Sequence, residues 1–262
     1  MYNASDGKEE MDKMSKTSIF HLSDIHIGEQ GVNVGEFQRA VDEVRELASE
    51  TESPLVLITG DLTSGGLREE YESFAAVVDS VDVPMVIVPG NHDERNYGAA
   101  QFEKIFGERF KTYQDENIAL YAADSAEPDN DAGHVGRAKY REIREFFSES
   151  EGKVRIFALH HHLVPVPHTG REHNVVEDAG DLLGLLDESK CNLVLNGHRH
   201  VPWMWRLNDV VHYTTGTLLS RRIRGANTQV YTVVEVSPEE ARFTLREREG
   251  ASKSFASCEL RK

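Results

Sequence analysis

The chain has 262 residues, 39% of them hydrophobic and 28% charged, which is ordinary globular usage and excludes a fibrous or wholly disordered protein. Its formal net charge of −16 repels polyanions at long range, so extended nucleic acid is not an expected partner and small substrates are favoured. No apolar run reaches the roughly 18 residues of a membrane span, and the polar segment 1–16 lacks the apolar stretch of a signal peptide. We therefore predict a cytoplasmic protein without membrane contact.

The sequence predicts one folded domain. Residues 1–16 are polar, and we expect them to be a disordered N-terminal segment that precedes a single domain over residues 17–262. Cys191 lies in an apolar run and Cys258 in the polar C-terminal stretch, and two cysteines are too few for a disulfide framework. We expect the first to be a core residue and the second a surface residue.

Short apolar runs that end in polar loops indicate buried strands. In chain order they are TSIFHLS before Asp24, PLVLITG before Asp61, PMVIVPG before Asn91, KVRIFALH ending at His160, and CNLVLNG before His198. Helical patterns lie between the early runs. One face of residues 35–50 carries Phe37, Val41, Val44 and Leu47, and the next helix carries Leu67, Tyr71, Phe74, Val78 and Val81. This alternation predicts an α/β architecture with a largely parallel sheet.

The pattern changes after His200. Three apolar segments follow without helices between them, namely VVHYTTG, TQVYTVVEV and ARFTLRERE. We interpret them as an antiparallel addition in a second sheet packed on the first. The stretch from about Glu247 onward is charged and weakly patterned, and we assign no chemistry to it.

Polar residues that can bind metal follow the C-terminal ends of the five predicted strands that precede His200. Open α/β sheets bind their ligands at this end of their strands. Asp24 and His26 flank Ile25, Asp61 follows Gly60, Asn91 and His92 follow Gly90, His160 closes its strand, and His198 and His200 flank Arg199. We expect the loops to converge on one pocket, and the glycines to let the side chains after them approach it closely.

Imidazole and carboxylate groups suit divalent transition metals, and two ions need about four protein groups each if one carboxylate is shared. Seven residues with one bridge meet that need: Asp24, His26, Asp61, Asn91, His160, His198 and His200. Asp61 is the natural bridge because a carboxylate has two oxygens, whereas an imidazole offers one coordinating nitrogen. We predict two divalent transition-metal ions, and such mixed nitrogen and oxygen sites accept Mn, Fe, Zn, Co or Ni.

Taken together, these blocks resemble the calcineurin-like metallophosphoesterases. D-I-H at 24–26, G-D at 60–61, G-N-H-D at 90–93, His160 and G-H-R-H at 197–200 occur in this order between about Ile19 and His200. Each block alone is weak, but their joint occurrence is specific. The resemblance implies a four-layer α-β-β-α sandwich of two mixed sheets flanked by helices, with a dimetal centre at the sheet edge.

The resemblance also implies roles for the residues. The first ion would be held at the positions of Asp24, His26, Asp61 and His200. The second would be held at the positions of Asp61, Asn91, His160 and His198. His92 matches the family's catalytic histidine, and Asp93 matches the acidic residue that orients it. Within the run of three histidines, the strand end and the family pattern favour His160 as the ligand, with His161 as the alternative.

A mechanism follows from these assignments. A metal-bridging hydroxide would attack phosphorus in line with the departing oxygen, while the ions neutralise the phosphoryl oxygens. His92 would protonate the leaving oxygen, because an imidazole can exchange a proton near neutral pH. Asp93 would fix the tautomer of His92.

The leading hypothesis is a phosphodiesterase for a small molecule, with nucleotides among the candidates, because the compact chain is similar to the cyclic-nucleotide phosphodiesterase branch. A phosphomonoesterase is one alternative. A DNA nuclease of the same superfamily is another, but it would need a basic groove and a capping domain that the sequence does not display. An inactive scaffold or interaction protein would have lost ligands, whereas here every ligand position holds a suitable residue.

Several nearby residues allow two interpretations. His168, Arg171 and His173 follow the histidine run, where either substrate contacts or ordinary solvated loop residues are expected. Trp203 and Trp205 could stack on a base, although core or edge packing is favoured. Arg199 lies between two proposed ligands, and strand alternation would aim it away from both.

Overall fold

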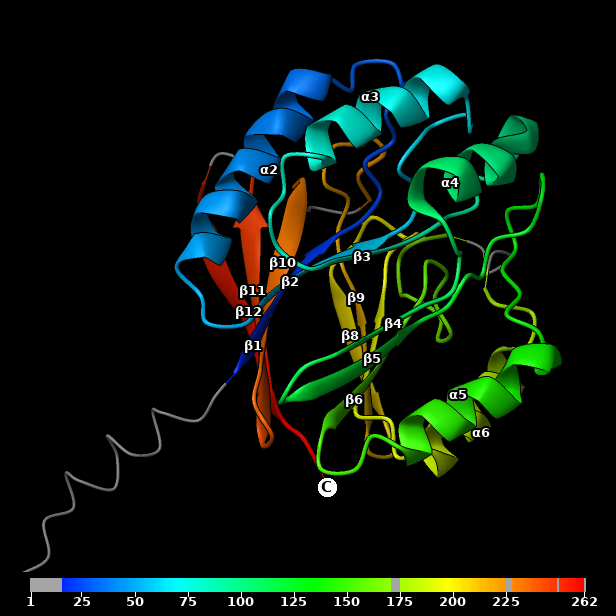
Figure 1. Ribbon diagram of the computed structural model, residues 1–262, viewed down its shortest axis with the longest axis vertical. Coiled ribbons are helices and arrows are strands. Elements are labelled where there is room, and N and C mark those ends of the chain that lie inside the picture. The colour runs from blue at the N-terminus through cyan, green and yellow to red at the C-terminus, as the bar shows by residue number, and fades with distance from the viewer. Residues whose placement is uncertain (1–15, 171–174, 225–227, 249, 262) are drawn as a thin grey trace, which may run out of the picture.

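The computed structural model describes residues 16–170, 175–224, 228–248 and 250–261. The predicted disordered segment thus lies outside the described residues, apart from Lys16. Within the described ranges, the chain forms two mixed sheets that pack face to face, with helices on both outer faces (Figure 1). This is the four-layer α-β-β-α sandwich that the resemblance implied.

The first sheet has the strand order β12-β11-β10-β1-β2-β3. Its parallel part consists of β1 (Thr17–Leu22), β2 (Pro54–Thr59) and β3 (Met85–Val88). Its antiparallel part consists of β10 (Val230–Val236), β11 (Glu240–Glu247) and β12 (Ser252–Glu259). Because β10 pairs with β1, the C-terminal part of the chain extends the sheet that the N-terminal part begins.

The second sheet has the order β4-β5-β6-β7-β9-β8. The parallel strands are β5 (Ile118–Ala122), β6 (Val154–Ala158), β7 (Leu193–Asn196) and β9 (Val210–Thr214). The antiparallel edge strands are β4 (Lys111–Gln114) and β8 (Trp203–Leu207). The carboxyl ends of the parallel strands in both sheets are therefore available to form one site.

The structure confirms the five predicted early strands, but the later strands are arranged differently from the prediction. β6 ends at Ala158, two residues before His160. The three late segments divide between the sheets, since β9 is parallel to β7 in the second sheet, whereas β10 and β11 are antiparallel and belong to the first. β12 lies in the stretch that had no clear pattern, where it is an edge strand with few buried side chains.

Helices cover both outer faces (Figure 1). The first sheet is covered by α2 (Val34–Ser49), α3 (Arg68–Val78) and α4 (Gly98–Phe106), and the second by α5 (Tyr140–Ser148) and α6 (Ala179–Glu188). The Asn33 side chain caps α2 by accepting a hydrogen bond from Gly35 N at 2.7 Å. Leu67 precedes α3 and is 40% exposed, and Val81 lies beyond the end of this helix. The buried face of α3 is therefore shorter than the hydrophobic periodicity of the sequence suggested.

Three layers of apolar side chains hold the sandwich together. One lies between the sheets, one under α2 to α4 and one under α5 and α6. Phe37 and Phe74, both fully buried, stack between α2 and α3 with ring centroids 5.0 Å apart. Burial of a side chain of this size stabilises the fold by roughly 1.5–3 kcal/mol. Cys191 is buried as predicted, and Cys258 is half-buried against the inter-sheet core.

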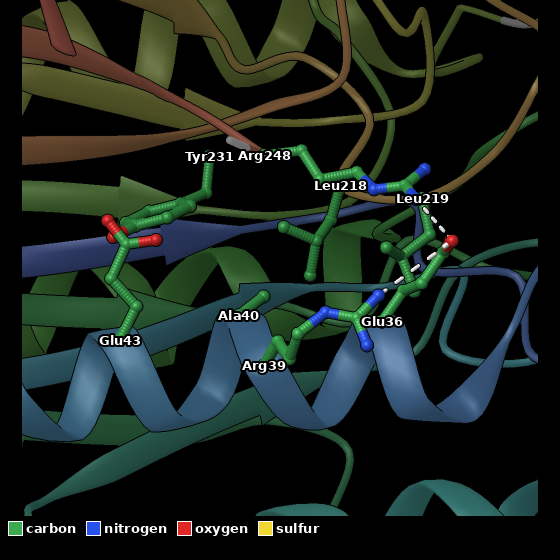
Figure 2. Close-up of a pocket in the computed structure, with 8 residues that line it drawn as sticks. All are labelled: Glu36, Arg39, Ala40, Glu43, Leu218, Leu219, Tyr231 and Arg248. Atoms are coloured by element: carbon green, nitrogen blue, oxygen red, sulfur yellow. Dashed lines mark hydrogen bonds and ion pairs between the residues drawn. The ribbon is translucent and has the colours of Figure 1, made fainter. Parts of the chain in front are cut away.

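A cavity of about 140 Å³ lies between α2 and β10 (Figure 2). Leu218, Leu219 and Tyr231 contribute its apolar wall, and Glu36 pairs with Arg248 at its rim. None of the predicted metal ligands lines it. Among the helices in the described part of the chain, none is long and apolar enough to cross a membrane.

Candidate metal centre

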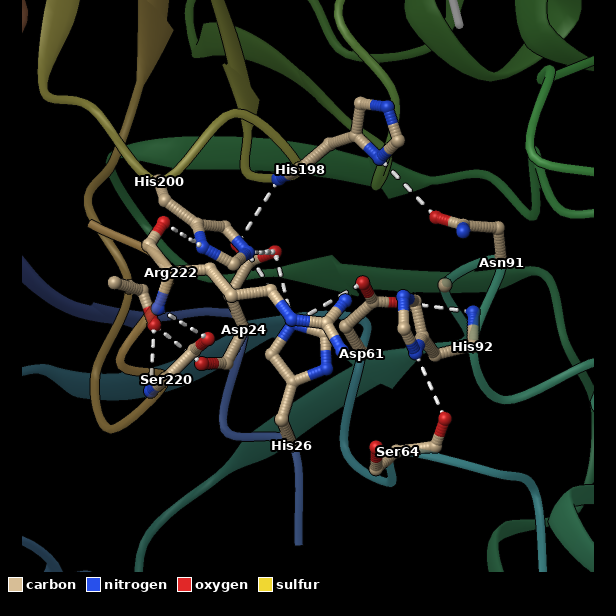
Figure 3. Close-up of polar contacts among 12 residues, drawn as sticks. Asp24, His26, Asp61, Ser64, Asn91, His92, His198, His200, Ser220 and Arg222 are labelled. Atoms are coloured by element: carbon tan, nitrogen blue, oxygen red, sulfur yellow. Dashed lines mark hydrogen bonds and ion pairs between the residues drawn. The ribbon is translucent and has the colours of Figure 1, made fainter. Parts of the chain in front are cut away.

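The predicted ligands meet at one edge of the sandwich, because the strands before them end there. Figure 3 labels all of these ligands except His160. Loops after β1, β2 and β3 of the first sheet and after β6 and β7 of the second contribute them. The residues are Asp24 and His26 after β1, Asp61 after β2, Asn91 after β3, His160 after β6, and His198 and His200 after β7. The site therefore exists only where the two sheets face each other.

The first cluster comprises Asp24, His26, Asp61 and His200. His200 Nε2 lies 3.1 Å from Asp24 Oδ1 and 3.2 Å from His26 Nε2. His26 Nε2 lies 3.5 Å from Asp61 Oδ2. Four potential ligand atoms thus surround one small volume, and all four residues are buried.

The second cluster comprises Asp61, Asn91, His160 and His198. His160 Nε2 lies 3.1 Å from both Asn91 Oδ1 and His198 Nδ1, and 3.5 Å from Asp61 Oδ1. Asn91 Oδ1 is also 3.1 Å from His198 Nδ1. Asp61 therefore presents Oδ2 to the first cluster and Oδ1 to the second.

The hydrogen bonds behind two of the histidines show which ring nitrogen of each faces its cluster. His160 Nδ1 lies 2.7 Å from the Thr59 carbonyl oxygen, and His200 Nδ1 lies 3.0 Å from the Arg222 carbonyl oxygen. A carbonyl oxygen can only accept, so each Nδ1 carries a ring proton, and each Nε2 is the atom left to coordinate an ion once the ring is neutral. Burial alone would lower the pKa of His200, but the Asp24 carboxylate raises that pKa above its ordinary value, so an ion that binds His200 would displace a proton. Such backbone acceptors behind a histidine are the usual outer support of a metal ligand.

Asn91 completes this pattern. Its Nδ2 donates to Asp131 Oδ1 at 2.8 Å, so its carbonyl oxygen is the atom that faces the second cluster. Lone pairs of His160, Asn91 and Asp61 only 3.1–3.5 Å apart repel one another unless a cation lies among them. The donor set of imidazole nitrogens and carboxylate and amide oxygens therefore fits divalent transition-metal ions.

Burial and charge prepare these groups for coordination. Burial lowers the pKa of His26 to about 3 and holds the pKa of His198 well below its ordinary value, so both imidazoles are neutral at pH 7. Burial alone would raise the pKa of Asp61, but the neighbouring His160 and His92 pull that pKa below its usual range. Metal ligands must be deprotonated, and these three groups already are.

The loops that carry the ligands are held in strained conformations. Positive φ angles occur at Asp24 (56°), His26 (53°), Asp61 (51°), His198 (72°) and His200 (58°). This region costs non-glycine residues roughly 1–2 kcal/mol each, and such strain typically persists at functional sites. Two glycines permit the close packing, since a Cβ at Gly90 would lie 2.3 Å from Asp61 Oδ1 and one at Gly197 would lie 1.8 Å from Ser23 Oγ.

The two candidate histidines of the run occupy different positions. His160 Nε2 contacts the other members of the second cluster, as described above. His161 Nδ1 instead lies 2.9 Å from Ser125 Oγ, and its ring packs against Gly133. His161 also offers a ring nitrogen within 4.8 Å of ligand atoms of His160 and His198. His160 Nε2, however, lies within 3.5 Å of both Asn91 Oδ1 and Asp61 Oδ1, so the geometry favours His160 as the ligand.

His92 lies beside both clusters. Its backbone N–H donates to Asp61 Oδ1 at 2.9 Å, and its ring meets the His26 ring edge-on at a centroid distance of 4.6 Å. Its Nδ1 lies 2.8 Å from the Ser64 carbonyl oxygen and 2.9 Å from Arg95 Nη1. Nδ1 thus faces both a carbonyl acceptor and a guanidinium donor, and Nε2 is the ring nitrogen left to face a substrate.

Asp93 differs from the prediction that it orients the His92 ring. Its carboxylate accepts from Leu62 N at 3.1 Å, Thr63 N at 2.9 Å, Thr63 Oγ1 at 2.8 Å and Gly90 N at 2.9 Å. These bonds occupy both oxygens and join the loop after β2 to the loop after β3. Asp93 therefore supports the loops that carry Asp61 and Asn91, and the groups that contact the His92 ring are Ser64 and Arg95.

Arg199 and the two tryptophans behave as the sequence favoured. The Arg199 guanidinium is buried and donates to Thr169 Oγ1 at 2.9 Å, away from both flanking ligands. Trp203 and Trp205 lie on the edge strand β8, and Trp205 Nε1 donates to the Pro165 carbonyl at 2.9 Å. This packing attaches the loop after the histidine run to the sheet.

The remaining loop residues contribute less. His168 is exposed, and Arg171 and His173 lie outside the described residues. Sequence reasoning missed Arg95 and Asp131, which contact His92 and Asn91. Arg95 follows G-N-H-D closely enough to be noticed, whereas Asp131 lies in a polar loop without a motif.

The fold and the paired acceptor clusters define an α/β metalloenzyme whose site lies between two facing sheets. A model of the calcineurin-like phosphoesterase family matches residues 17–202. The chain belongs to this family and is a metal-dependent phosphoesterase.

Curated relatives and solved structures agree with this family. The chain is 24% identical over 240 residues to a probable cyclic nucleotide phosphodiesterase of Xenorhabdus bovienii, with 84% of this chain and 96% of the relative covered. It is 26% identical over 215 residues to a 3′,5′-cyclic-nucleotide phosphodiesterase of Nostoc sp., with 78% of each covered. The structure of GAP50, the anchor in the inner membrane complex of Plasmodium, shares the fold, with a TM-score of 0.65, 15% identity and coverage of 94% of this chain and 89% of that one.

Proposed function

We propose that this protein hydrolyses a phosphodiester bond in a small nucleotide, with 3′,5′-cyclic nucleotides as the substrate class, and that it uses two divalent metal ions. The observation that carries the proposal is Asp61, whose two oxygens face two separate sets of acceptors. One shared carboxylate between two such sets is the arrangement of a two-metal hydrolase. The names of the curated relatives support the choice of substrate.

The ligands divide between the two ions. Asp24, His26, Asp61 and His200 would hold the first, and Asp61, Asn91, His160 and His198 the second. Ions of Mn, Fe, Zn, Co or Ni suit these groups, and when bound they supply a water-derived nucleophile near neutral pH and neutralise charge on the phosphoryl group. Thr59 and Arg222 would keep His160 and His200 in the coordinating tautomer through their carbonyl oxygens.

His92 would act as the general acid. Ser64 and Arg95 occupy Nδ1, so Nε2 is the ring nitrogen that would donate a proton to the leaving alkoxide oxygen. An alkoxide from a nucleoside is a poor leaving group and gains from this proton, whereas an aryloxide gains little. Asp93 would act indirectly by holding the loops of Asp61 and Asn91 at the distances described above.

The test compares three substrates on metal-stripped protein. Hydrolysis of bis(p-nitrophenyl) phosphate, p-nitrophenyl phosphate and 3′,5′-cyclic AMP would be measured with and without Mn²⁺. Asp61→Ala removes the bridge, and Asp42→Ala, at an exposed position of α2, is the matched control. Mn²⁺-dependent cleavage of both diesters, absent from Asp61→Ala and intact in Asp42→Ala, is the expected result.

Other outcomes contradict parts of the proposal. A preference for the monoester would make the protein a phosphatase. No hydrolysis with Mn, Fe, Zn, Co or Ni would refute the diesterase assignment. For the acid role, His92→Ala should keep its metal content and lose far more turnover on cyclic AMP than on the aryl diester, and equal losses would contradict it.

A further inference from the structure

A single carboxylate oxygen on a distant loop contacts two parts of the site. Asp131 lies between β5 and the short helix η2 (Arg137–Lys139). Its Oδ1 accepts from Asn91 Nδ2 at 2.8 Å and from Arg95 Nη2 at 2.9 Å. Asn91 belongs to the second cluster, and Arg95 contacts the His92 ring, so this oxygen connects the proposed metal site to the proposed acid.

The contact with Asn91 determines which end of the amide faces the metal. An amide side chain can rotate by half a turn and exchange its oxygen for its NH₂ group at little intrinsic cost. With Nδ2 bound to Asp131, Oδ1 faces His160 Nε2 and His198 Nδ1 at 3.1 Å. The flipped amide would present hydrogens to the cation, and the second cluster would lose one of its four ligands.

The contact between Asp131 and Arg95 restricts the orientation of His92, the proposed general acid. Arg95 Nη1 lies 2.9 Å from His92 Nδ1 and 3.5 Å from the Ser64 carbonyl oxygen, which contacts the same ring nitrogen. The guanidinium therefore lies beside the edge of the imidazole opposite Nε2. Asp131 holds the other end of the guanidinium, which limits rotation of the His92 ring.

The loop of Asp131 is itself well anchored. The Ala132 N–H donates to Asn130 Oδ1 at 3.1 Å, and the Gly133 carbonyl accepts from Glu177 N at 2.7 Å. Gly133 also packs on the His161 ring, where a Cβ would come within 2.6 Å of Cγ. A buried histidine beside the metal ligand His160 thus helps to place the loop that carries Asp131.

We propose that Asp131 is a positioning residue that orients Asn91 directly and His92 through Arg95, the role that the sequence suggested for Asp93. The inference rests on the proposed function, because it takes the second cluster as a metal site and His92 as the acid. One carboxylate oxygen then positions both a proposed ligand of the second metal ion and, through Arg95, the proposed acid.

The first experiment measures metal binding without catalysis. Calorimetric titration of metal-stripped protein with Mn²⁺ would compare the wild type with Asp131→Ala, Asp131→Asn and Asp129→Asn. Loss of an outer support of a metal ligand typically weakens binding 10–100-fold, so Asp131→Ala should weaken one of two sites by that factor and leave the other within about threefold. Asp131→Asn retains an acceptor oxygen and should recover most of the affinity.

Asp129→Asn is the matched control, because it removes the same charge from an exposed position of the same loop and should bind as the wild type does. Asp131 has a side chain that is 54% exposed, so its substitution should leave the melting temperature of the metal-free protein unchanged. Two unaltered sites in Asp131→Ala would overturn the proposal, whether or not any diester is cleaved, so this test fails separately from the proposed function.

The second experiment tests the path through Arg95. At saturating Mn²⁺, kcat would be measured on aryl diesters with leaving groups from p-nitrophenol to phenol. Asp131→Ala and Arg95→Gln should both steepen the loss of kcat toward phenol by about tenfold, with metal binding normal in Arg95→Gln. An unchanged leaving-group dependence in both variants would overturn the connection to His92.

Discussion

Asp61→Asn should abolish most of the stabilisation that Mn²⁺ confers on this protein. The carboxylate lies with Oδ2 3.5 Å from His26 Nε2 and Oδ1 3.5 Å from His160 Nε2. An amide has one carbonyl oxygen and no charge, so asparagine can serve only one cluster and serves it weakly. The substitution therefore affects both metal sites at once, while the shape of the residue is preserved.

The magnitude follows from ligand linkage. At free Mn²⁺ of 100 times Kd, each ion stabilises the folded state by about 2.7 kcal/mol, or about 5 kcal/mol for two ions. Loss of an outer support weakens metal binding 10–100-fold, so loss of the bridge should weaken it at least about 100-fold, which leaves about 0.4 kcal/mol per ion. At about 2–4 °C per kcal/mol for a chain of this size, the Mn²⁺-induced rise in Tm should fall from about 10–20 °C to about 2–3 °C.

The assay is thermal unfolding followed by circular dichroism, with chelator and then with the same free Mn²⁺ for every variant. Because only the difference between the two conditions is compared, any change in the stability of the metal-free fold cancels. Asp42→Asn on α2 is the control and should keep the full rise. A full Mn²⁺-induced rise in Asp61→Asn, with two ions still bound, would refute the bridging geometry.

Two further predictions concern the fold. Phe74→Ala should lower the free energy of unfolding, measured with urea, by about 3–5 kcal/mol, because Phe74 is fully buried against Phe37. The control Tyr97→Ala, at a side chain 91% exposed, should change it by no more than about 0.5 kcal/mol. Equal losses in the two variants would contradict the packing. Burial raises the pKa of Glu94 from 4.5 to about 7, so the folded state binds this proton more tightly. The contribution of Glu94 to stability should therefore be greatest below pH 4.5 and fall by up to about 3 kcal/mol as pH rises through 7. Urea unfolding of the metal-free protein across that range should show a smaller fall for Glu94→Gln, and an identical fall would mean that another group titrates.

Local pattern in the sequence was sufficient for the strands and for the residues at their ends. The runs before Asp24, Asp61 and Asn91 are continuous and apolar because both faces of those strands are buried, one against the helices and one against the other sheet. The polar residue after each run then falls at the carboxyl edge by chain geometry alone. The seven proposed ligands could therefore be named before the fold was known.

The same reasoning failed where burial is weak or pairing is distant. β12 has few buried side chains because it is an edge strand, so it leaves no strong alternation to read. The sheet to which β9, β10 and β11 belong depends on which strand each one pairs with, and β10 pairs with β1 from the other end of the chain. The hydrophobic pattern of a strand indicates which of its side chains are buried, but it does not indicate with which other strand it pairs.

The sequence by itself was enough to predict a metal-binding site, since the types and spacing of its residues suit transition metals. Only the tertiary structure decided how those residues divide, with Asp61 turned toward two clusters, and which groups support them. Asp93, next to His92 in sequence, has both oxygens occupied by backbone and Thr63 donors, whereas Asp131, far away in sequence, reaches Asn91 and Arg95. Which side chains contact each other depends on distances across the folded loops. Adjacency in the chain fixes where the backbone of a residue lies, but it does not fix which groups its side chain contacts.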